Sequence, residues 1–143
     1  MGLPIHKIEK PLERKADPFN EHEPVDSSAA AIGAQGLLRL GRFLAKKDPE
    51  AGKKYWQAGL TVMNTLLDEP YLSTGSGHQG ILLHTIYHEP NAWDNKPDPK
   101  RAAFGESSMW GDYHMREVAC YLSKIVKKEK YYTFFGCIEN LSL

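Results

Sequence analysis

Two stretches of the chain show apolar residues at helical spacing with only a narrow polar stripe. The first, residues 27–46, has its stripe at positions spaced four, three and four apart: Gln35, Arg39, Arg42 and Lys46. The second, residues 49–67, has a similar stripe: Lys53, Gln57, Thr61, Asn64 and, just beyond, Asp68. Almost every other position in both stretches is apolar or small. Each predicted helix is therefore expected to be buried over most of its circumference.

The residues before each stretch are typical helix starts. Asp26 or Ser27 is the predicted N-cap of the first helix, and Asp48 followed by Pro49 opens the second. The turn between the helices is very short, which predicts an antiparallel αα-hairpin. Because two helices cannot cover such broad apolar surfaces alone, further helices are expected on both sides.

Gly33 and Gly36 interrupt the first helical pattern. Each costs about 1 kcal/mol of helix propensity relative to alanine. Either another backbone or a ligand approaches closely at these positions, or the glycines are merely tolerated. The pattern does not separate these two readings.

A third helix is predicted over residues 108–127. Its apolar positions repeat at intervals of three, four and three: Met115, Val118, Leu122 and Ile125. Four charged positions are expected to face water: Arg116, Glu117, Lys124 and Lys127. Cys120 is interpreted as a small buried group. The tail that follows has four aromatic residues in the five positions 131–135, and it is expected to dock on a neighbouring surface.

The segment between the second and third helices is predicted to contain a short β-hairpin. Residues 69–80 read as a loop because they are rich in glycine and serine. Residues 81–88 are short, apolar and β-branched, which favours a strand with His84, Ile86 and His88 on one face. Residues 91–100 form a polar loop, and residues 101–104 are expected to pair back as a second strand.

Composition limits the class of protein. The 143 residues suffice for one modest domain, with residues 1–25 as an extended lead-in and 26–143 as a helical, all-α unit. Eighteen basic and 18 acidic residues give a formal net charge of zero, so neither nucleic acid nor an anionic membrane is an expected partner. No membrane-spanning run, signal-peptide core or disulfide framework is evident, which favours a cytoplasmic protein.

Residues 105–124 hold the densest chemistry, because a polar loop runs directly into an apolar helix. Seven polar or aromatic residues fall within nine positions: Glu106, Ser107, Ser108, Trp110, Asp112, Tyr113 and His114. This density indicates the rim of a pocket. The competing interpretation is purely structural, with Ser107 or Ser108 as an N-cap, Asp112 at the positive end of the helix dipole and Trp110 in the core.

Several familiar catalytic patterns are absent. His78, His84 and His88 lie near Glu89 and Asp94, but without an HExxH motif no metal site is expected, and sugar contact or a structural role is favoured. A serine, aspartate and histidine triad of Ser108, Asp112 and His114 lacks the GxSxG turn. Four acids lie beside polar, aromatic segments as glycosidase carboxylates do, but their spacing selects no pair: Asp26, Asp94, Glu106 and Asp112.

Four stretches together resemble glycoside hydrolase family 88, the unsaturated glucuronyl hydrolases. They are DSSAAAIGAQGLLRLG (26–41), GHQGILLHTIYH (77–88), PNAWD (90–94) and ESSMWGDYH (106–114). The resemblance extends from about Asp26 to Phe135, and the order of the stretches is more specific than any one of them. The unsaturated rhamnogalacturonyl hydrolases, which share the family's fold, are a weaker match.

The resemblance implies an (α/α)6 barrel of six helical hairpins, of which this chain would cover about the last third. Family members hydrolyse oligosaccharides released by polysaccharide lyases, which end in a 4,5-unsaturated uronic acid. An aspartate hydrates the double bond as general acid and base, without a metal or an organic cofactor. The family's key aspartates belong to earlier hairpins, so no catalytic residue is assigned here and the chain alone is expected to be inactive.

The resemblance also suggests which residues line and support the sugar site. The expected substrate-binding residues are His84, His88, Trp93, Arg101, Ser107, Ser108 and Trp110. The expected supporting residues are Asp26, Glu106, Asp112 and Tyr113. An unsaturated uronic-acid oligosaccharide is the expected partner, together with self-association or pairing with the missing N-terminal part. The alternative is a non-catalytic helical module for sugar binding or assembly.

Overall fold

The computed structural model describes residues 25–75, 77–86, 107–133 and 136–138. Several of the expectations above therefore lie outside the described residues. These are nearly the whole lead-in, the end of the first predicted strand with His88, the second predicted strand, Trp93, Arg101 and Glu106.

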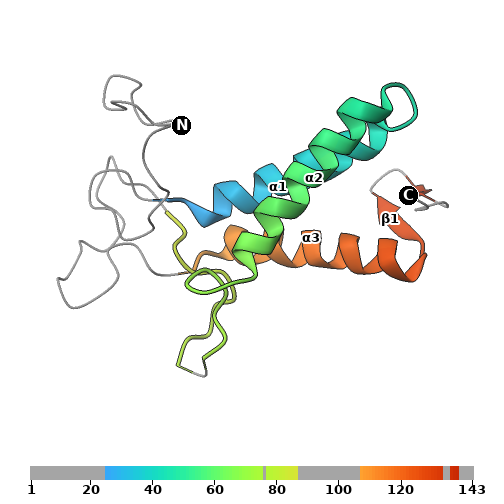
Figure 1. Cartoon of the computed structure of the whole chain (residues 1–143). Helices are drawn as coiled ribbons and strands as arrows, with labels where there is room; N and C mark the ends of the chain where they lie inside the picture. Colours follow the sequence, from blue (N-terminus) through green and yellow to red (C-terminus); the bar gives the residue numbers. More distant parts are fainter. Residues whose placement is uncertain (1–24, 76, 87–106, 134–135, 139–143) are drawn as a thin grey trace, which may run out of the picture.

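Three α-helices form most of the described structure (Figure 1): α1 (Ser27–Leu44), α2 (Pro49–Leu66) and α3 (Met109–Lys127). After α3 a small antiparallel hairpin joins β1 (Tyr131–Thr133) to β2 (Gly136–Ile138), with Tyr131 opposite Ile138. The prediction of an all-α fold is confirmed. The partial barrel stays a prediction.

The predicted helix starts are confirmed by their caps. The Asp26 side chain accepts a hydrogen bond from the Ser28 amide at 3.0 Å, and Asp48 accepts one from the Ala51 amide at 3.0 Å. Ser108 Oγ accepts from the Gly111 amide at 3.1 Å. Each cap satisfies one of the amides that the first turn of a helix leaves without an intrahelical partner.

Helices α1 and α2 form the predicted antiparallel hairpin, and glycines let their backbones touch. A Cβ on Gly41 would lie 2.6 Å from the Trp56 amide nitrogen, and one on Gly52 would lie 2.7 Å from the Ala45 Cα. Neither clash can be relieved by rotating a side chain, because the opposing atoms are backbone. Gly41 and Gly52 therefore fix the closest approach of the two helices.

Gly33 and Gly36, the glycines singled out from the sequence, do not serve this purpose. A Cβ at either position would meet no described atom within 4 Å. Both lie on the face of α1 that points away from α2 and α3. In the described part of the chain, the reading that these glycines are merely tolerated therefore holds.

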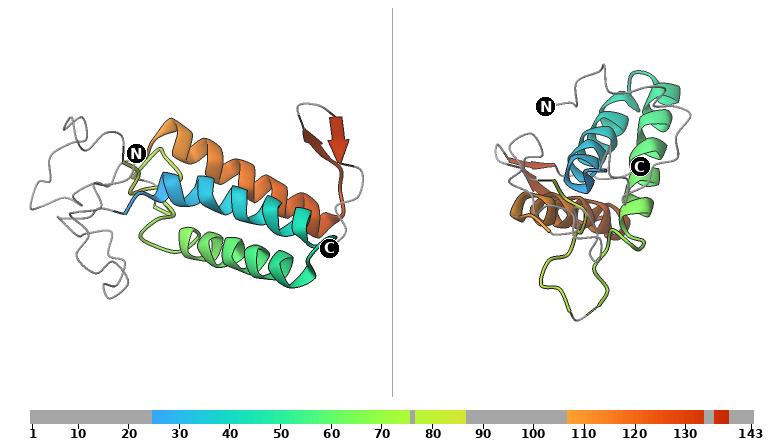
Figure 2. Two further views of the ribbon diagram at one scale, coloured as in Figure 1. Left: turned by 90° about the horizontal axis from the view of Figure 1, so that it is seen from above. Right: turned by 90° about the vertical axis from the view of Figure 1, so that its left-hand side faces the viewer.

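Helix α3 packs beside α1 and runs parallel to it (Figure 2). Contacts near the starts of the helices join Ser28 to Trp110, and contacts further along join Arg39 to Glu117. The core between the helices is formed by these side chains: Ala31, Ala34, Leu38, Met63, Leu66, Met115, Val118 and Ile125. Leu82, from the segment between α2 and α3, completes it and is fully buried.

The prediction that α1 is buried over most of its circumference fails on one face. Gln35 and Arg39 of the polar stripe contact Glu117 of α3, while Ile32, Leu40 and Phe43 on the adjacent outer face are 45%, 39% and 60% exposed. The polar stripe of α1 therefore lies partly against a polar partner on α3. In the described part of the chain, the apolar outer face of α1 has no such neighbour.

On α3 the predictions for two residues are wrong. Glu117 contacts α1 instead of facing only water. Cys120 is exposed, because it follows the buried Val118 by two residues and so lies about 200° around the helix from it.

The strand predicted over residues 81–88 is wrong for its described part. Residues 81–86 are irregular apart from one bridge between Leu72 and Leu82, and His84 has a left-handed φ of 62°. Their backbone groups bond to side chains and backbone at the starts of α1 and α3, as described below. At the bridge, the Ile81 carbonyl accepts from the Ser73 amide and the Leu83 amide donates to the Tyr71 carbonyl, each at 2.8 Å, but this pairing does not extend into a strand. The observed hairpin instead follows the last helix.

Candidate functional site

Three segments that are far apart in the sequence meet where α1 and α3 begin (Figures 1 and 2). On the α1 side, the Ser27 amide donates to the His84 carbonyl at 3.0 Å, and Ser27 Oγ donates to the Leu83 carbonyl at 2.6 Å. Asp26 Oδ1 accepts from the Ile86 amide at 3.3 Å. The first turn of α1 thus holds residues 83–86 by hydrogen bonds.

On the α3 side, Asp112 holds the other half of the same segment. Its carboxylate accepts from the Ile81 amide at 3.0 Å and from the Leu82 amide at 2.8 Å. A carboxylate that accepts two backbone N–H groups makes strong, charge-assisted bonds. Asp112 also lies in the first turn of α3, where its negative charge favours the helix dipole. It therefore serves both the helix and the preceding segment.

Trp110 joins the two helix starts directly. Its Nε1–H donates to Ser28 Oγ at 3.1 Å, and Ser28 Oγ donates to Asp26 Oδ1 at 2.7 Å. The result is a chain of two hydrogen bonds, from the Trp110 indole to the Ser28 hydroxyl and from that hydroxyl to the Asp26 carboxylate. The half-buried indole is fixed in orientation by this chain, as a rigid wall of a binding site must be.

Close packing at two glycines completes the motif end, as we call residues 26–28, 80–86 and 107–112. A Cβ on Gly80 would lie 1.8 Å from Ser107 Oγ, and a Cβ on Gly111 would lie 2.7 Å from Thr85 Cγ2. No larger residue fits at either glycine without movement. The ESSMWGDYH and GHQGILLH stretches are therefore in direct contact.

The structure brings together most of the predicted site residues that it describes. Ser107, Ser108, Trp110, Asp26 and Asp112 all belong to the motif end. His84 is 3% exposed and its ring meets Tyr71 edge-on at 5.8 Å, so it lies in the interior of the described part. Tyr113 lies on the outer side of α3, is 60% exposed and packs edge-on against His114.

The three groups of the triad weighed above have separate partners. Ser108 caps α3, Asp112 accepts backbone amides, and His114 contacts Gln35. None of these contacts joins one member of the triad to another. The geometry gives no support for nucleophilic catalysis by Ser108.

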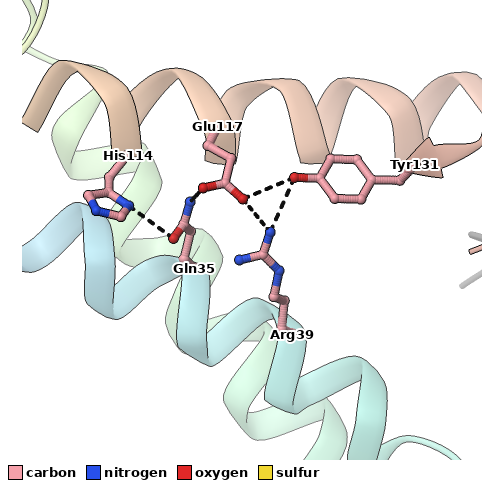
Figure 3. A network of polar contacts seen from close by, with 5 residues as sticks. All are labelled: Gln35, Arg39, His114, Glu117 and Tyr131. Atoms are coloured by element: carbon pink, nitrogen blue, oxygen red, sulfur yellow. Dashed lines mark hydrogen bonds and ion pairs between the residues drawn. The ribbon is translucent and has the colours of Figure 1, made fainter. Parts of the chain in front are cut away.

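A second polar cluster links α1, α3 and β1, and it was not anticipated from the sequence (Figure 3). Glu117 is its centre: Gln35 Nε2 donates to Oε2 at 2.5 Å, and Arg39 Nη2 donates to Oε1 at 2.6 Å. The Tyr131 hydroxyl donates to Oε1 at 3.1 Å and accepts from Arg39 Nη2 at 3.2 Å. This network ties β1 to both helices.

His114 extends the network toward the start of α3. Its Nδ1 lies 3.2 Å from Gln35 Oε1. Since the Gln35 amide nitrogen donates to Glu117, the amide oxygen is the acceptor, and we assign the proton to His114 Nδ1. The sequence did contain a signal for this cluster. Gln35 and Arg39 are four residues apart, and His114 and Glu117 are three residues apart; residues at these spacings lie on the same face of a helix.

The ionic states within the network are set by opposing effects. Burial alone would raise the pKa of Glu117, but hydrogen bonds from Arg39, Gln35 and Tyr131 and the charge of Arg39 bring it below its ordinary value. Burial alone would lower the pKa of Arg39, but Glu117 raises it. Burial and the bond to Glu117 raise the pKa of Tyr131. The network therefore stabilises the ionised form of Glu117.

Two further observations concern classes of site. Among residues 25–75, 77–86, 107–133 and 136–138, no group of three or more histidine, cysteine, aspartate or glutamate side chains is arranged to hold a metal ion. None of the three described helices is both long and apolar enough to cross a bilayer.

Comparisons with family models, with curated proteins and with solved structures gave no match to this chain.

Proposed function

We propose that this chain is the C-terminal part of a glycoside hydrolase of the unsaturated glucuronyl hydrolase type. One observation carries the proposal: three of the four stretches that suggested it meet at the motif end. They are joined there by hydrogen bonds from Ser27, Asp112 and Trp110. Segments separated by some 25 to 80 residues need such mutual contacts to form one edge of a binding site.

The bonds of the two described acids favour a supporting role for them. Asp26 caps α1 and accepts from the Ile86 amide, and Asp112 accepts from the Ile81 and Leu82 amides. A general acid must instead present a protonated oxygen to the substrate. The proposal therefore takes the catalytic aspartate to lie on another part of the enzyme, and neither a metal nor an organic cofactor is invoked.

The outer face of α1 supports the idea of additional helices. Ile32 and Leu40 are large apolar side chains that are 45% and 39% exposed, beside Gly33 and Gly36. Such a face is normally buried by a neighbouring helix. In the proposed enzyme this neighbour belongs to the N-terminal part, and without it the chain is expected to self-associate.

A non-catalytic sugar-binding or assembly module is the alternative function. It is favoured by the same two acids, because both are engaged by backbone amides and neither is presented for chemistry. It differs from the first proposal in requiring no N-terminal part for its activity.

Turnover assays separate the two functions. The full chain is incubated with unsaturated chondroitin or heparin disaccharides, and the loss of the double-bond absorbance is followed. We expect no turnover by the chain alone and turnover after addition of a polypeptide that supplies the preceding hairpins. Turnover by the chain alone would refute the assignment of the acid to a missing part. No turnover in the combined sample would favour the module.

Binding is tested separately by NMR. We expect an unsaturated disaccharide to shift the Trp110 indole resonance, whereas a saturated disaccharide of the same composition shifts it less. Trp110→Phe removes the bond to Ser28 and should weaken binding about three- to ten-fold, as expected for one hydrogen bond. Equal shifts with both sugars would count against specificity for the unsaturated residue.

Self-association is tested on the outer face of α1. Leu40→Ser should lower the sedimentation coefficient of the concentrated chain toward that of a monomer, because it removes apolar surface from this face. Thr61→Ala on the exposed side of α2 is the matched control, and it should leave the sedimentation coefficient unchanged. Sedimentation of the unaltered chain as a stable monomer would weaken the proposal of a missing neighbour.

A further inference from the structure

Half of the basic residues of this chain gather at one end of the helices. Residues 42–54 and 124–130 carry nine of the 18 lysines and arginines and only three of the 18 acids, a formal charge of +6. The remainder of the chain carries −6. The net charge of zero, which argued against an anionic partner, therefore averages over two oppositely charged parts.

The fold places residues 42–54 and 124–130 at the same end of the helices. Helices α1 and α3 run parallel, so both end on the same side, and the α1–α2 turn returns the chain at that end (Figure 2). The end of α1, the start of α2 and the end of α3 thus lie at the same end of the helices, which we call the basic end; Figure 1 shows the α1–α2 turn set apart from the end of α3. Seven of its lysines are exposed: Lys46, Lys47, Lys53, Lys54, Lys127, Lys128 and Lys130.

Helix capping explains only part of this cluster. Lysines after the last turns of α1 and α3 offset the negative ends of those helix dipoles. Lys53 and Lys54 do not, because they lie in the second turn of α2, nearer its positive end. The gathering of positive charge therefore exceeds what helix stability requires.

Two large apolar side chains are exposed at the same end. Phe43 lies in the last turn of α1 and is 60% exposed, and Val126 lies in the last turn of α3 and is 81% exposed. The Lys47 ammonium lies 4.7 Å from the centre of the Phe43 ring. Apolar groups among lysines are characteristic of surfaces that bind bilayers, where the apolar group enters the interface and the ammonium reaches the headgroups.

From these observations we propose that the basic end docks on an anionic lipid bilayer. A soluble polyanion would use the lysines but would leave Val126 in water. Nucleic-acid sites favour arginine for its planar, bidentate guanidinium, whereas eight of the nine basic residues here are lysines.

The described acids at the starts of α1 and α3 do not prevent this docking. Helix α1 has 18 residues and so is about 27 Å long. Asp26 and Asp112 lie near the opposite end, and the screening length at physiological salt is only about 8 Å. A bilayer that touches the basic end is therefore screened from these acids by roughly three screening lengths.

Vesicle co-sedimentation of the full chain tests the proposal. We expect binding to phosphatidylcholine vesicles that contain roughly 30% phosphatidylserine, loss of binding as salt rises, and little binding to pure phosphatidylcholine. K46Q/K47Q and K127Q/K128Q should each weaken binding on the order of twenty-fold, since each lysine near such a surface contributes about a factor of five. F43S/V126S should also weaken binding while preserving its salt dependence.

Matched controls use charges elsewhere or of opposite sign. R116Q removes an exposed positive charge from the middle of α3 and should change binding by less than about two-fold. E50Q removes an acid from the basic end and should strengthen binding. Circular dichroism of each variant checks that the helices are intact.

Three results would overturn the proposal. They are equal binding to neutral and anionic vesicles, unchanged vesicle binding by the F43S/V126S variant, and binding to duplex DNA without binding to vesicles. The second would mean that Phe43 and Val126 do not enter the bilayer, and the last would assign the basic end to a soluble polyanion. Because no glycan enters this experiment, its outcome is independent of the proposed hydrolase function.

Discussion

Single residues at the contact between α1 and α2 decide how closely the helices approach. Gly41 and Gly52 are required by backbone atoms less than 3 Å from where a Cβ would lie, whereas Gly36 faces open space in the described part. All three are glycines within helices, so propensity treats them alike. Only the packing partner separates a required glycine from a tolerated one.

This difference gives a paired prediction. Gly41→Ala should lower the free energy of unfolding by about 1 to 3 kcal/mol, because the methyl group forces the helices apart. Gly36→Ala should raise it by up to about 1 kcal/mol through helix propensity. Urea unfolding followed by circular dichroism measures both. Equal effects of the two substitutions would show that the helices do not touch at Gly41.

At the scale of elements, residues 80–86 are held by the helices on either side of them instead of by a strand. Ser27 donates hydrogen bonds to backbone carbonyls of this segment, and Asp112 accepts them from the Ile81 and Leu82 amides. The short, apolar and β-branched run of residues 81–88 is typical of a strand, yet His84 and Thr85 are neighbours and both buried. Side-chain anchors from distant segments override the local preference.

Removing one of these anchors should loosen the segment locally. Asp112→Ala should lower the free energy of unfolding by about 1 to 3 kcal/mol, because two amides lose their acceptor. It should also speed hydrogen exchange at the Ile81 and Leu82 amides, measured by NMR.

The matched control for this loss is Asp48→Ala. It removes the N-cap of α2 at a cost of about 1 kcal/mol but leaves those two amides untouched. If both variants changed exchange at Ile81 and Leu82 alike, the effect would be global unfolding and the proposed anchoring by Asp112 would fail.

For the whole molecule, the network around Glu117 joins three elements and makes stability depend on pH. The Arg39–Glu117 pair is 43% and 25% exposed at its two side chains, so by itself it contributes less than about 1 kcal/mol. Gln35 and Tyr131 donate two further hydrogen bonds to Glu117. The Glu117 carboxylate therefore stabilises the fold more than a single surface ion pair would.

The sign of this pH dependence follows from the lowered pKa of Glu117. A carboxyl group whose pKa falls on folding stabilises the protein above its unfolded pKa, close to 4.5, and this contribution is lost as pH falls through the lower folded pKa. Glu117→Gln should therefore destabilise the chain by about 1 to 2 kcal/mol at pH 7. The difference between the two proteins should shrink below pH 4.5.

Unfolding midpoints in urea at several pH values measure this difference. Glu50→Gln is the matched control, because Glu50 is exposed in the first turn of α2 outside the network. A difference between Glu117→Gln and the unaltered chain that stayed constant from pH 7 to pH 3 would mean that the charge of Glu117 is not what the network holds.

The sequence by itself determined the local features of this protein: three helices, the cap at Asp48, the caps of α1 and α3 to within two residues (Asp26 or Ser27, Ser107 or Ser108), and the antiparallel hairpin of α1 and α2. These depend on hydrogen bonds and apolar spacing within a few residues, which a pattern records directly. It also marked Ser107, Trp110 and Asp112 as belonging to one dense segment. The tertiary structure decided the rest.

Only the tertiary structure decided that Gln35 and Glu117 face each other, that Asp112 holds residues 81 and 82, and that the lysines gather at one end. The physical reason is the same in each case. A polar or charged side chain is stabilised by water or by a partner, and its own sequence neighbours do not reveal which. The answer depends on which distant segment the fold brings beside it.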